Sequence, residues 1–160
     1  MRRSIFVLVF SVLGLASAAA REHAFSPDKH FEAYIVAAEA DGTGSKLFLR
    51  ASGRDDPGVL LCTNTRWIAA RWSPDSRFLT VIDHFDGHMA DVYIYYVTPG
   101  ATPSGVVHDL RYRSPDSGVY DTQWDVVRWN TKRATATVLR VTRRDEQRFV
   151  VPLDSGSKHP

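Results

Sequence analysis

From residue 31 onward, short runs of β-branched and aromatic residues alternate with short polar segments rich in Gly, Pro, Asp and Ser. Runs of this length with little helical periodicity are typical of β-strands. The intervening segments, such as Asp41-Gly42 and Thr98-Pro99-Gly100, carry turn chemistry and predict connections within one domain. The pattern predicts strands at 31–38, 46–50, 59–63, 68–72, 78–83, 91–97, 106–110, 123–129, 134–142 and 147–153. We therefore predict an all-β domain built from antiparallel meanders.

The run 91–97 carries large side chains at both alternating sets of positions. Successive side chains of a strand point to opposite faces, so we expect this strand to be covered on both sides. One face would carry Val92, Ile94 and Tyr96, and the other Tyr93, Tyr95 and Val97.

One motif recurs along the chain. Trp72-Ser73-Pro74-Asp75 precedes an apolar run, a hairpin signal at Asp86-Gly87 and a second run beginning Asp91-Val92-Tyr93. The same order begins about 47 residues earlier at Ser26-Pro27-Asp28, and a weaker third copy without Pro-Asp begins at Trp129-Asn130-Thr131. Repeats of this period predict blade-like units.

The unit from Trp72 to Tyr95 resembles the repeat of TolB-type, WD-like β-propellers. In that family a tryptophan, Ser-Pro-Asp-Gly, a basic residue, an apolar strand, a hairpin and a strand beginning Asp-Ile-Tyr follow one another. Ser76 stands where the family usually has glycine, a departure that we expect a type I turn to tolerate. The resemblance is clear for this unit and weak for the other two. It implies periplasmic protein contacts through propeller faces, in a family that contains both binding modules and enzyme domains.

The length of the chain limits the number of units. Closed propellers need at least about four blades, whereas about 140 residues beyond the predicted leader offer three at most. We therefore predict two to three blade-like units that do not close into a ring within one chain, with a β-sandwich as the alternative. Terminal units with uncovered apolar faces would favour association.

The N-terminus has the three parts of an export signal: Arg2 and Arg3, an apolar run from Ile5 to Leu15, and the small residues of 16–20. The apolar run is shorter than the roughly 20 residues of a membrane-spanning helix. We predict a signal peptide at 1–20, a single β-rich domain with blade-like repeats at 21–154 and a flexible tail at 155–160. The protein would be periplasmic or secreted, with no stable membrane anchor after cleavage.

Charge and cysteine content narrow the function classes. The 20 basic residues against 18 acidic ones include Arg2 and Arg3 of the predicted signal, so the remaining domain is close to neutral. A nucleic-acid partner is not expected, because no concentrated basic face is present in the sequence. Cys62 is the only cysteine, so no internal disulfide forms, and its apolar surroundings predict a buried, inert thiol.

Two motifs carry side chains that could perform chemistry. Trp72, Ser73, Pro74 and Asp75 are explained as a structural motif, since Trp packs between sheets, Pro sets the turn and the carboxylate accepts amide hydrogens. The segment His84, Asp86 and His88 could present two imidazoles and a carboxylate to a divalent metal if it were extended. The hairpin signal at Asp86-Gly87 favours a polar turn instead, and we predict no metal and no cofactor.

A cluster of aromatic residues near the C-terminus leaves two interpretations open. The side chains either form the core of the third unit or a binding surface, because Trp, Tyr and Arg are enriched at interface hot spots. They are Tyr112, Tyr120, Trp124 and Trp129.

Together these features favour an exported, non-enzymatic β-domain that mediates protein–protein interaction, with another protein or with itself as partner. Two alternatives remain: a metal-dependent hydrolase centred on His84, Asp86 and His88, and an envelope glycan-binding domain using Trp124 and Trp129.

Overall fold

The computed structural model describes residues 21–36, 44–63, 66–86, 88–115 and 121–153. Within these ranges the chain is built from strands and one 3-10 turn, η1 (Thr131–Arg133). The strands are β1 (Arg21–Phe25), β2 (Phe31–Val36), β3 (Lys46–Ala51), β4 (Val59–Thr63), β5 (Trp67–Trp72), β6 (Phe78–Asp86), β7 (Met89–Pro99), β8 (Val106–Arg113), β9 (Gln123–Asn130), β10 (Thr135–Val141) and β11 (Glu146–Pro152). The prediction of an all-β fold is confirmed.

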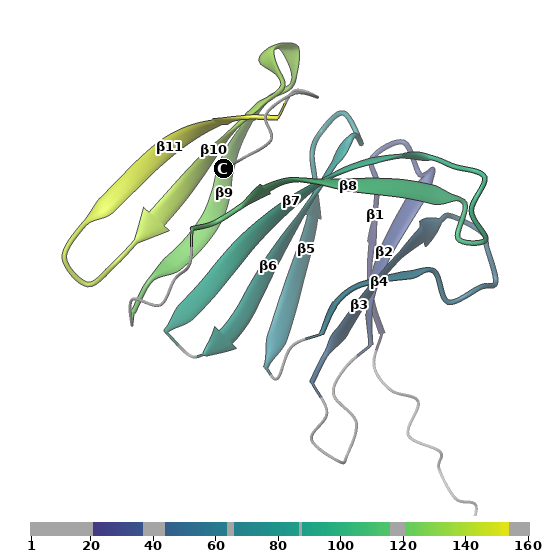
Figure 1. Ribbon diagram of the computed structural model, residues 1–160, viewed down its shortest axis with the longest axis horizontal. Coiled ribbons are helices and arrows are strands. Elements are labelled where there is room, and N and C mark those ends of the chain that lie inside the picture. Colours follow the sequence, from purple (N-terminus) through teal and green to yellow (C-terminus); the bar gives the residue numbers. More distant parts are fainter. Residues whose placement is uncertain (1–20, 37–43, 64–65, 87, 116–120, 154–160) are drawn as a thin grey trace, which may run out of the picture.

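The strands form three consecutive antiparallel meanders (Figure 1). We call β1–β4 the N-terminal unit, β5–β8 the central unit and β9–β11 the C-terminal unit. One parallel bridge between Ala90 and Gln123 joins the central and C-terminal units near the start of β7. The described strands fan out without closing into a ring, as expected for a chain with too few blades to close one.

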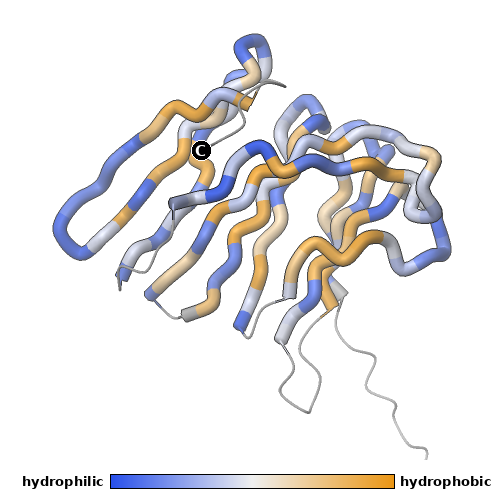
Figure 2. Tube along the Cα trace, in the orientation of Figure 1, coloured by the Kyte–Doolittle hydropathy of each residue, from blue (hydrophilic) through white to orange (hydrophobic). Residues whose placement is uncertain are grey.

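Two hydrophobic cores lie on the two sides of the central unit. The first joins Phe31, Leu47 and Leu49 of the N-terminal unit to Leu79 and Val81 of the central unit. The second joins the central unit to the C-terminal unit through residues that include Ile82, Val92, Ile94, Trp124 and Val138. Hydrophobic residues lie along the strands that form these cores, whereas the hairpin between β10 and β11 is hydrophilic (Figure 2).

Strand β7 contributes to both cores, as its sequence predicts. Val92 and Ile94 belong to the second core, and Tyr96 packs against it. Val97 belongs to the first core. The central unit is therefore an inner layer, covered on both faces.

An aromatic ring pair is repeated at the two boundaries between units. Trp72 stacks on Phe31 of the preceding unit with centroids 5.8 Å apart and an interplanar angle of 17°. Trp129 stacks on Phe78 of its preceding unit with centroids 5.9 Å apart and an angle of 18°. In addition, the Trp72 indole N–H donates to the Ala24 carbonyl at 2.8 Å. Each tryptophan thus fixes its own unit against the one before it.

The two Ser-Pro-Asp turns are closed by the same hydrogen bonds. Ser26 Oγ donates to Asp28 at 2.6 Å and accepts the Phe31 amide at 3.0 Å. Ser73 Oγ does the same with Asp75 at 2.6 Å and the Phe78 amide at 3.0 Å. The serine therefore holds the turn to the first residue of the next strand.

The turn before Ser76 has the hydrogen bond expected of a type I turn, from the Ser76 amide to the Ser73 carbonyl at 3.0 Å, and neither Pro74 nor Asp75 has a positive φ. Ser76 has a φ of 62° and the equivalent Lys29 a φ of 64°, in the left-handed region that favours glycine. This conformation costs an L-residue roughly 1–2 kcal/mol. At Ser76 the side chain offsets part of that cost, because its Oγ accepts the Asp28 amide of the neighbouring turn at 3.0 Å.

Strand β1 was not among the predicted strands. Its sequence, Arg-Glu-His-Ala-Phe, has no alternation of apolar and polar residues that would indicate a half-buried strand. The strand forms because it pairs with β2 over its whole length.

Replacing Trp72 with alanine should destabilise the protein by about 3 kcal/mol, because the ring stack on Phe31 and the indole hydrogen bond are lost together. Urea unfolding followed by circular dichroism measures this. Trp67→Ala is the matched control, since the Trp67 ring is 53% exposed and should contribute much less. Equal losses in the two variants would contradict the role assigned to Trp72.

Lys29→Gly should raise the free energy of unfolding by about 0.5 kcal/mol, because glycine adopts the left-handed conformation without strain. Ser76→Gly should gain less or lose stability, since it also removes the acceptor for the Asp28 amide. Lys132→Gly, within the 3-10 turn η1, is a control that should only destabilise. The three midpoints of urea unfolding should therefore rank Lys29→Gly highest.

Candidate functional site

The candidate site is one face of the N-terminal unit. The cross-strand register places His23, Tyr34 and Phe48 side by side, and likewise Phe25, Glu32 and Arg50. Directly opposed residues of paired strands point to the same face. The alternating positions of β2, among them Phe31, belong to the first core against the central unit. The face that carries Phe25 and Glu32 therefore points away from the central unit, and we call it the outer face.

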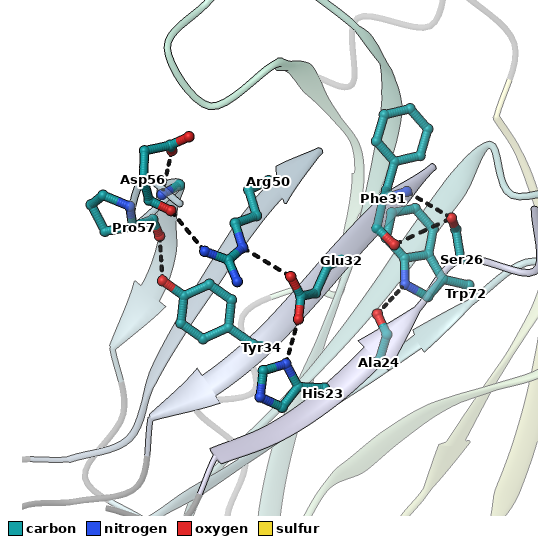
Figure 3. Close-up of polar contacts among 11 residues, drawn as sticks. His23, Ala24, Ser26, Phe31, Glu32, Tyr34, Arg50, Asp56, Pro57 and Trp72 are labelled. Carbon is teal, nitrogen blue, oxygen red and sulfur yellow. Dashed lines mark hydrogen bonds and ion pairs between the residues drawn. The ribbon is translucent and has the colours of Figure 1, made fainter. Parts of the chain in front are cut away.

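A buried carboxylate lies at the centre of the outer face. Glu32 is only 4% exposed. One carboxylate oxygen accepts the Arg50 Nε–H at 2.9 Å, and the other forms a short contact with His23 Nδ1 (Figure 3). Burial alone would raise the pKa of Glu32, but the hydrogen bonds from His23 and Arg50 hold it below its ordinary value. Glu32 is thus an ionised structural group with both oxygens engaged, not a free acid or base.

The same network fixes the loop before β4. Arg50 donates to the Asp56 carbonyl at 2.9 Å, and the Tyr34 hydroxyl donates to the Pro57 carbonyl at 2.5 Å. Figure 3 shows these contacts converging around the guanidinium group of Arg50. The outer face is therefore pre-organised by hydrogen bonds to backbone as well as by ion pairs.

Aromatic rings line the outer face around Glu32. The rings of Phe25 and His23, His23 and Tyr34, and Tyr34 and Phe48 are stacked, with centroid distances of 6.2, 5.9 and 5.3 Å. The Arg50 guanidinium lies 4.9 Å from the centre of the Tyr34 ring. Tyr34 is only 5% exposed, so Phe25 at the end of this series is the ring that a protein partner could contact, as aromatic residues at binding hot spots do.

Two large apolar side chains of the outer face remain accessible. Phe25 is 44% exposed and Leu60, which pairs with Phe48 on β4, is 50% exposed. The outer face therefore offers apolar contact area beside a charge cluster that is already neutralised.

The candidate metal ligands His84, Asp86 and His88 do not form a metal site in the described part of the chain. His84 lies in β6, where its ring stacks on Trp67 with centroids 3.5 Å apart. The side chain of His88 is 61% exposed and lies 3.8 Å from a carboxylate oxygen of Asp121. The Asp86 side chain lies outside the described residues. Among the described residues, no group of three or more His, Cys, Asp or Glu side chains has an arrangement suited to a metal ion.

The other predicted site residues belong to the packing between units wherever the structure describes them. Trp124 is 5% exposed and is part of the second core. Trp129 and Tyr112 are partly buried and pack against that core. Tyr120 lies outside the described residues. In the motif Trp72 to Asp75, all the interactions described above serve the turn or the neighbouring unit.

Sequence reasoning did not single out Glu32, His23 or Arg50. One signal was present: Glu32 interrupts the otherwise apolar run Phe-Glu-Ala-Tyr-Ile-Val of β2. An acid inside a buried strand requires charged partners, but the sequence alone does not reveal that His23 and Arg50 supply them.

A pair of carboxylates faces the boundary between the first two units. Asp83 and Asp91 are directly opposed on β6 and β7, and Asp91 accepts the Ser114 hydroxyl at 3.1 Å. Burial and the neighbouring Asp91 raise the pKa of Asp83 to about 6. Burial, together with Asp83, also raises the pKa of Cys62 to about 12, so that thiol stays protonated near neutral pH.

The sequence matches no known protein-family profile, no curated protein and no solved structure at a significant level. In the described ranges no helix is long and apolar enough to cross a membrane. The fold itself defines the class: an all-β protein of consecutive antiparallel meanders.

Asp83→Asn should stabilise the protein near pH 7 by about 1–2 kcal/mol and have little effect near pH 4. The reason is that the folded-state pKa of about 6 lies above the ordinary value of 3.8, so ionising Asp83 opposes folding. This penalty is absent below the lower value, grows as pH rises between the two values and is fully present above the higher one.

The measurement is urea unfolding of both proteins at several pH values between 4 and 7.5. Asp109→Asn is the control, since its side chain is 61% exposed and should give a nearly pH-independent change. A constant difference between wild type and Asp83→Asn at every pH would contradict the paired-carboxylate interpretation.

Proposed function

We propose that the chain is an exported, non-enzymatic domain, similar to TolB-like propeller units, that mediates protein–protein interaction through its outer face. The partner we propose is a second copy of the chain. The observation that carries the proposal is the position of Phe25. It immediately precedes Ser26, just as Trp72 precedes Ser73.

At the two internal boundaries, the aromatic residue before the turn stacks on a phenylalanine of the preceding unit. Phe25 is the first aromatic in this series, so the described chain offers it no preceding unit, and it is 44% exposed. The outer face therefore presents one half of an interface whose complete form occurs twice within the same molecule. A protein partner that covers Phe25 and Leu60 would bury apolar area as the internal boundaries do.

The charges of the outer face are compatible with docking. An unpaired buried charge would oppose association, because the desolvation penalty would remain uncompensated. Here Glu32 already has Arg50 and His23 as partners. Covering the face adds no unpaired carboxylate, which supports binding rather than catalysis as its role.

A face-to-face pair of copies is favoured over a head-to-tail stack. In a head-to-tail stack, the C-terminal unit of one copy would meet Phe25 of the next. However, Thr135 lies five residues after Asn130, where the other two units carry Phe31 and Phe78. The C-terminal unit therefore lacks the ring on which Phe25 would stack. Two outer faces related by a twofold axis bring Phe25 and Leu60 of both copies together, in the commonest symmetry of soluble oligomers.

Export is part of the same proposal. The basic residues, apolar run and small residues within 1–20 have the order of a signal peptide. A partner or second copy would then be met in the periplasm or outside the cell.

Light scattering coupled to size-exclusion chromatography tests the proposal on the exported, purified protein. A concentration-dependent dimer is expected, and Phe25→Asp or Leu60→Asp should shift it to monomer while leaving the circular dichroism spectrum unchanged. Val150→Asp is the matched control, because Val150 is 70% exposed but lies on β11 of the C-terminal unit.

Two results would overturn the assignment of the outer face. One is a monomer at all concentrations. The other is a dimer that Val150→Asp disrupts and Phe25→Asp does not, since that result would place the interface on the C-terminal unit.

A further inference from the structure

A groove lies where the C-terminal unit approaches the first strands of the central unit. Its volume is about 240 Å³. It is distinct from the outer face, since it is lined by strands β5, β6, β9 and β10. The residues that the argument uses are Trp67, Arg71, His84, Gln123 and Asp125.

Trp67 forms a flat platform in this groove. Its ring is 53% exposed and stacks on the His84 imidazole with centroids 3.5 Å apart and an interplanar angle of 12°. Burial lowers the pKa of His84, so a neutral imidazole backs the indole near pH 7. An exposed tryptophan that is stacked on a neighbouring ring presents an apolar surface in a fixed orientation, with little entropy lost when a ligand covers it.

Polar groups line the groove on both of its sides: Arg71 lies on β5, on the same face as Trp67, and Gln123 and Asp125 lie on β9. The Arg71 guanidinium is 3.4 Å from both carboxylate oxygens of Asp125. This pair is long and accessible, with side chains 60% and 40% exposed, and Gln123 adds an exposed amide. These groups supply donors and acceptors that a ligand can reach.

We propose that this groove binds one ring of a neutral saccharide. The apolar C–H face of the sugar would lie on Trp67, and its hydroxyl groups would exchange hydrogen bonds with Arg71, Asp125 and Gln123. A neutral polyol suits a groove that holds one cation and one anion, because a phosphate or a carboxylate would meet Asp125 and a cation would meet Arg71. An extended peptide needs a long row of pockets or a sheet edge, whereas this groove is one small compartment. The inference goes beyond the proposed protein interaction and concerns a different surface.

Isothermal titration calorimetry tests the inference with three neutral oligosaccharides: maltotriose, cellotriose and chitotriose. Binding of at least one of them at millimolar concentration or below is expected. Trp67→Ala should weaken it by at least about tenfold, Trp67→Phe should retain most of it, and Asp125→Asn should weaken it without unfolding the protein. A polyproline peptide and inorganic phosphate are the competing probes.

Phe25→Asp separates this inference from the proposed function, since it should abolish dimer formation and leave saccharide binding unchanged. The inference is overturned if none of the three oligosaccharides binds, if Trp67→Ala binds as tightly as wild type, or if only the peptide or phosphate binds in the groove.

Discussion

The contact on which this structure depends is the stack of a tryptophan of one unit on a phenylalanine of the unit before it. An isolated meander of three or four short strands has one sheet and cannot bury both of its faces. Trp72 on Phe31 and Trp129 on Phe78 bring three such meanders face to face. Each pair lies beside a turn, so the ring positions are set by the turn geometry. The two cores then form on either side of the central unit.

The residues next to these phenylalanines show how the N-terminal unit differs from the central unit. One residue after Phe78, Leu79 is fully buried against the N-terminal unit. The equivalent residue after Phe31 is Glu32, on the outer face. A polar end unit limits uncontrolled stacking of repeat proteins. Here the hydrogen-bonded group of Glu32, His23 and Arg50 replaces apolar packing at the centre of the face, while Phe25 and Leu60 leave apolar area exposed beside it. Such a face suits one geometry of association better than indiscriminate stacking.

Local patterns in the sequence predict most of the strands. The features that they do not predict depend on pairing between residues far apart in the chain. The β-branched and aromatic runs predict β2–β11 because their side chains match a pleated, half-buried surface. The two-sided character of 91–97 likewise predicts the inner layer. Strand β1 could not be found, since its residues become a strand through pairing with β2 and through the bond from Trp72 to Ala24. The turn tolerates Ser76 as expected, but the contact that supports its left-handed φ could not be predicted, because its hydroxyl accepts the amide of Asp28, far away in sequence. The outer face was missed for a related reason: His23, Glu32 and Arg50 come from three different strands, and only the register brings them together.

The boundary between the central and C-terminal units combines a rigid part with an open one. Trp129 on Phe78 and the second core hold the units together without help from the groove. The Arg71–Asp125 pair also spans this boundary, but at 3.4 Å and with exposed side chains it contributes little to stability. Arg71 and Asp125 can therefore give up their contact and bind ligand hydroxyl groups instead, at a small cost in folding free energy. Because Trp67 stacks on His84 of its own unit, this support remains in place when that exchange occurs. A boundary that is stabilised elsewhere in this way can hold a binding site while the fold remains intact.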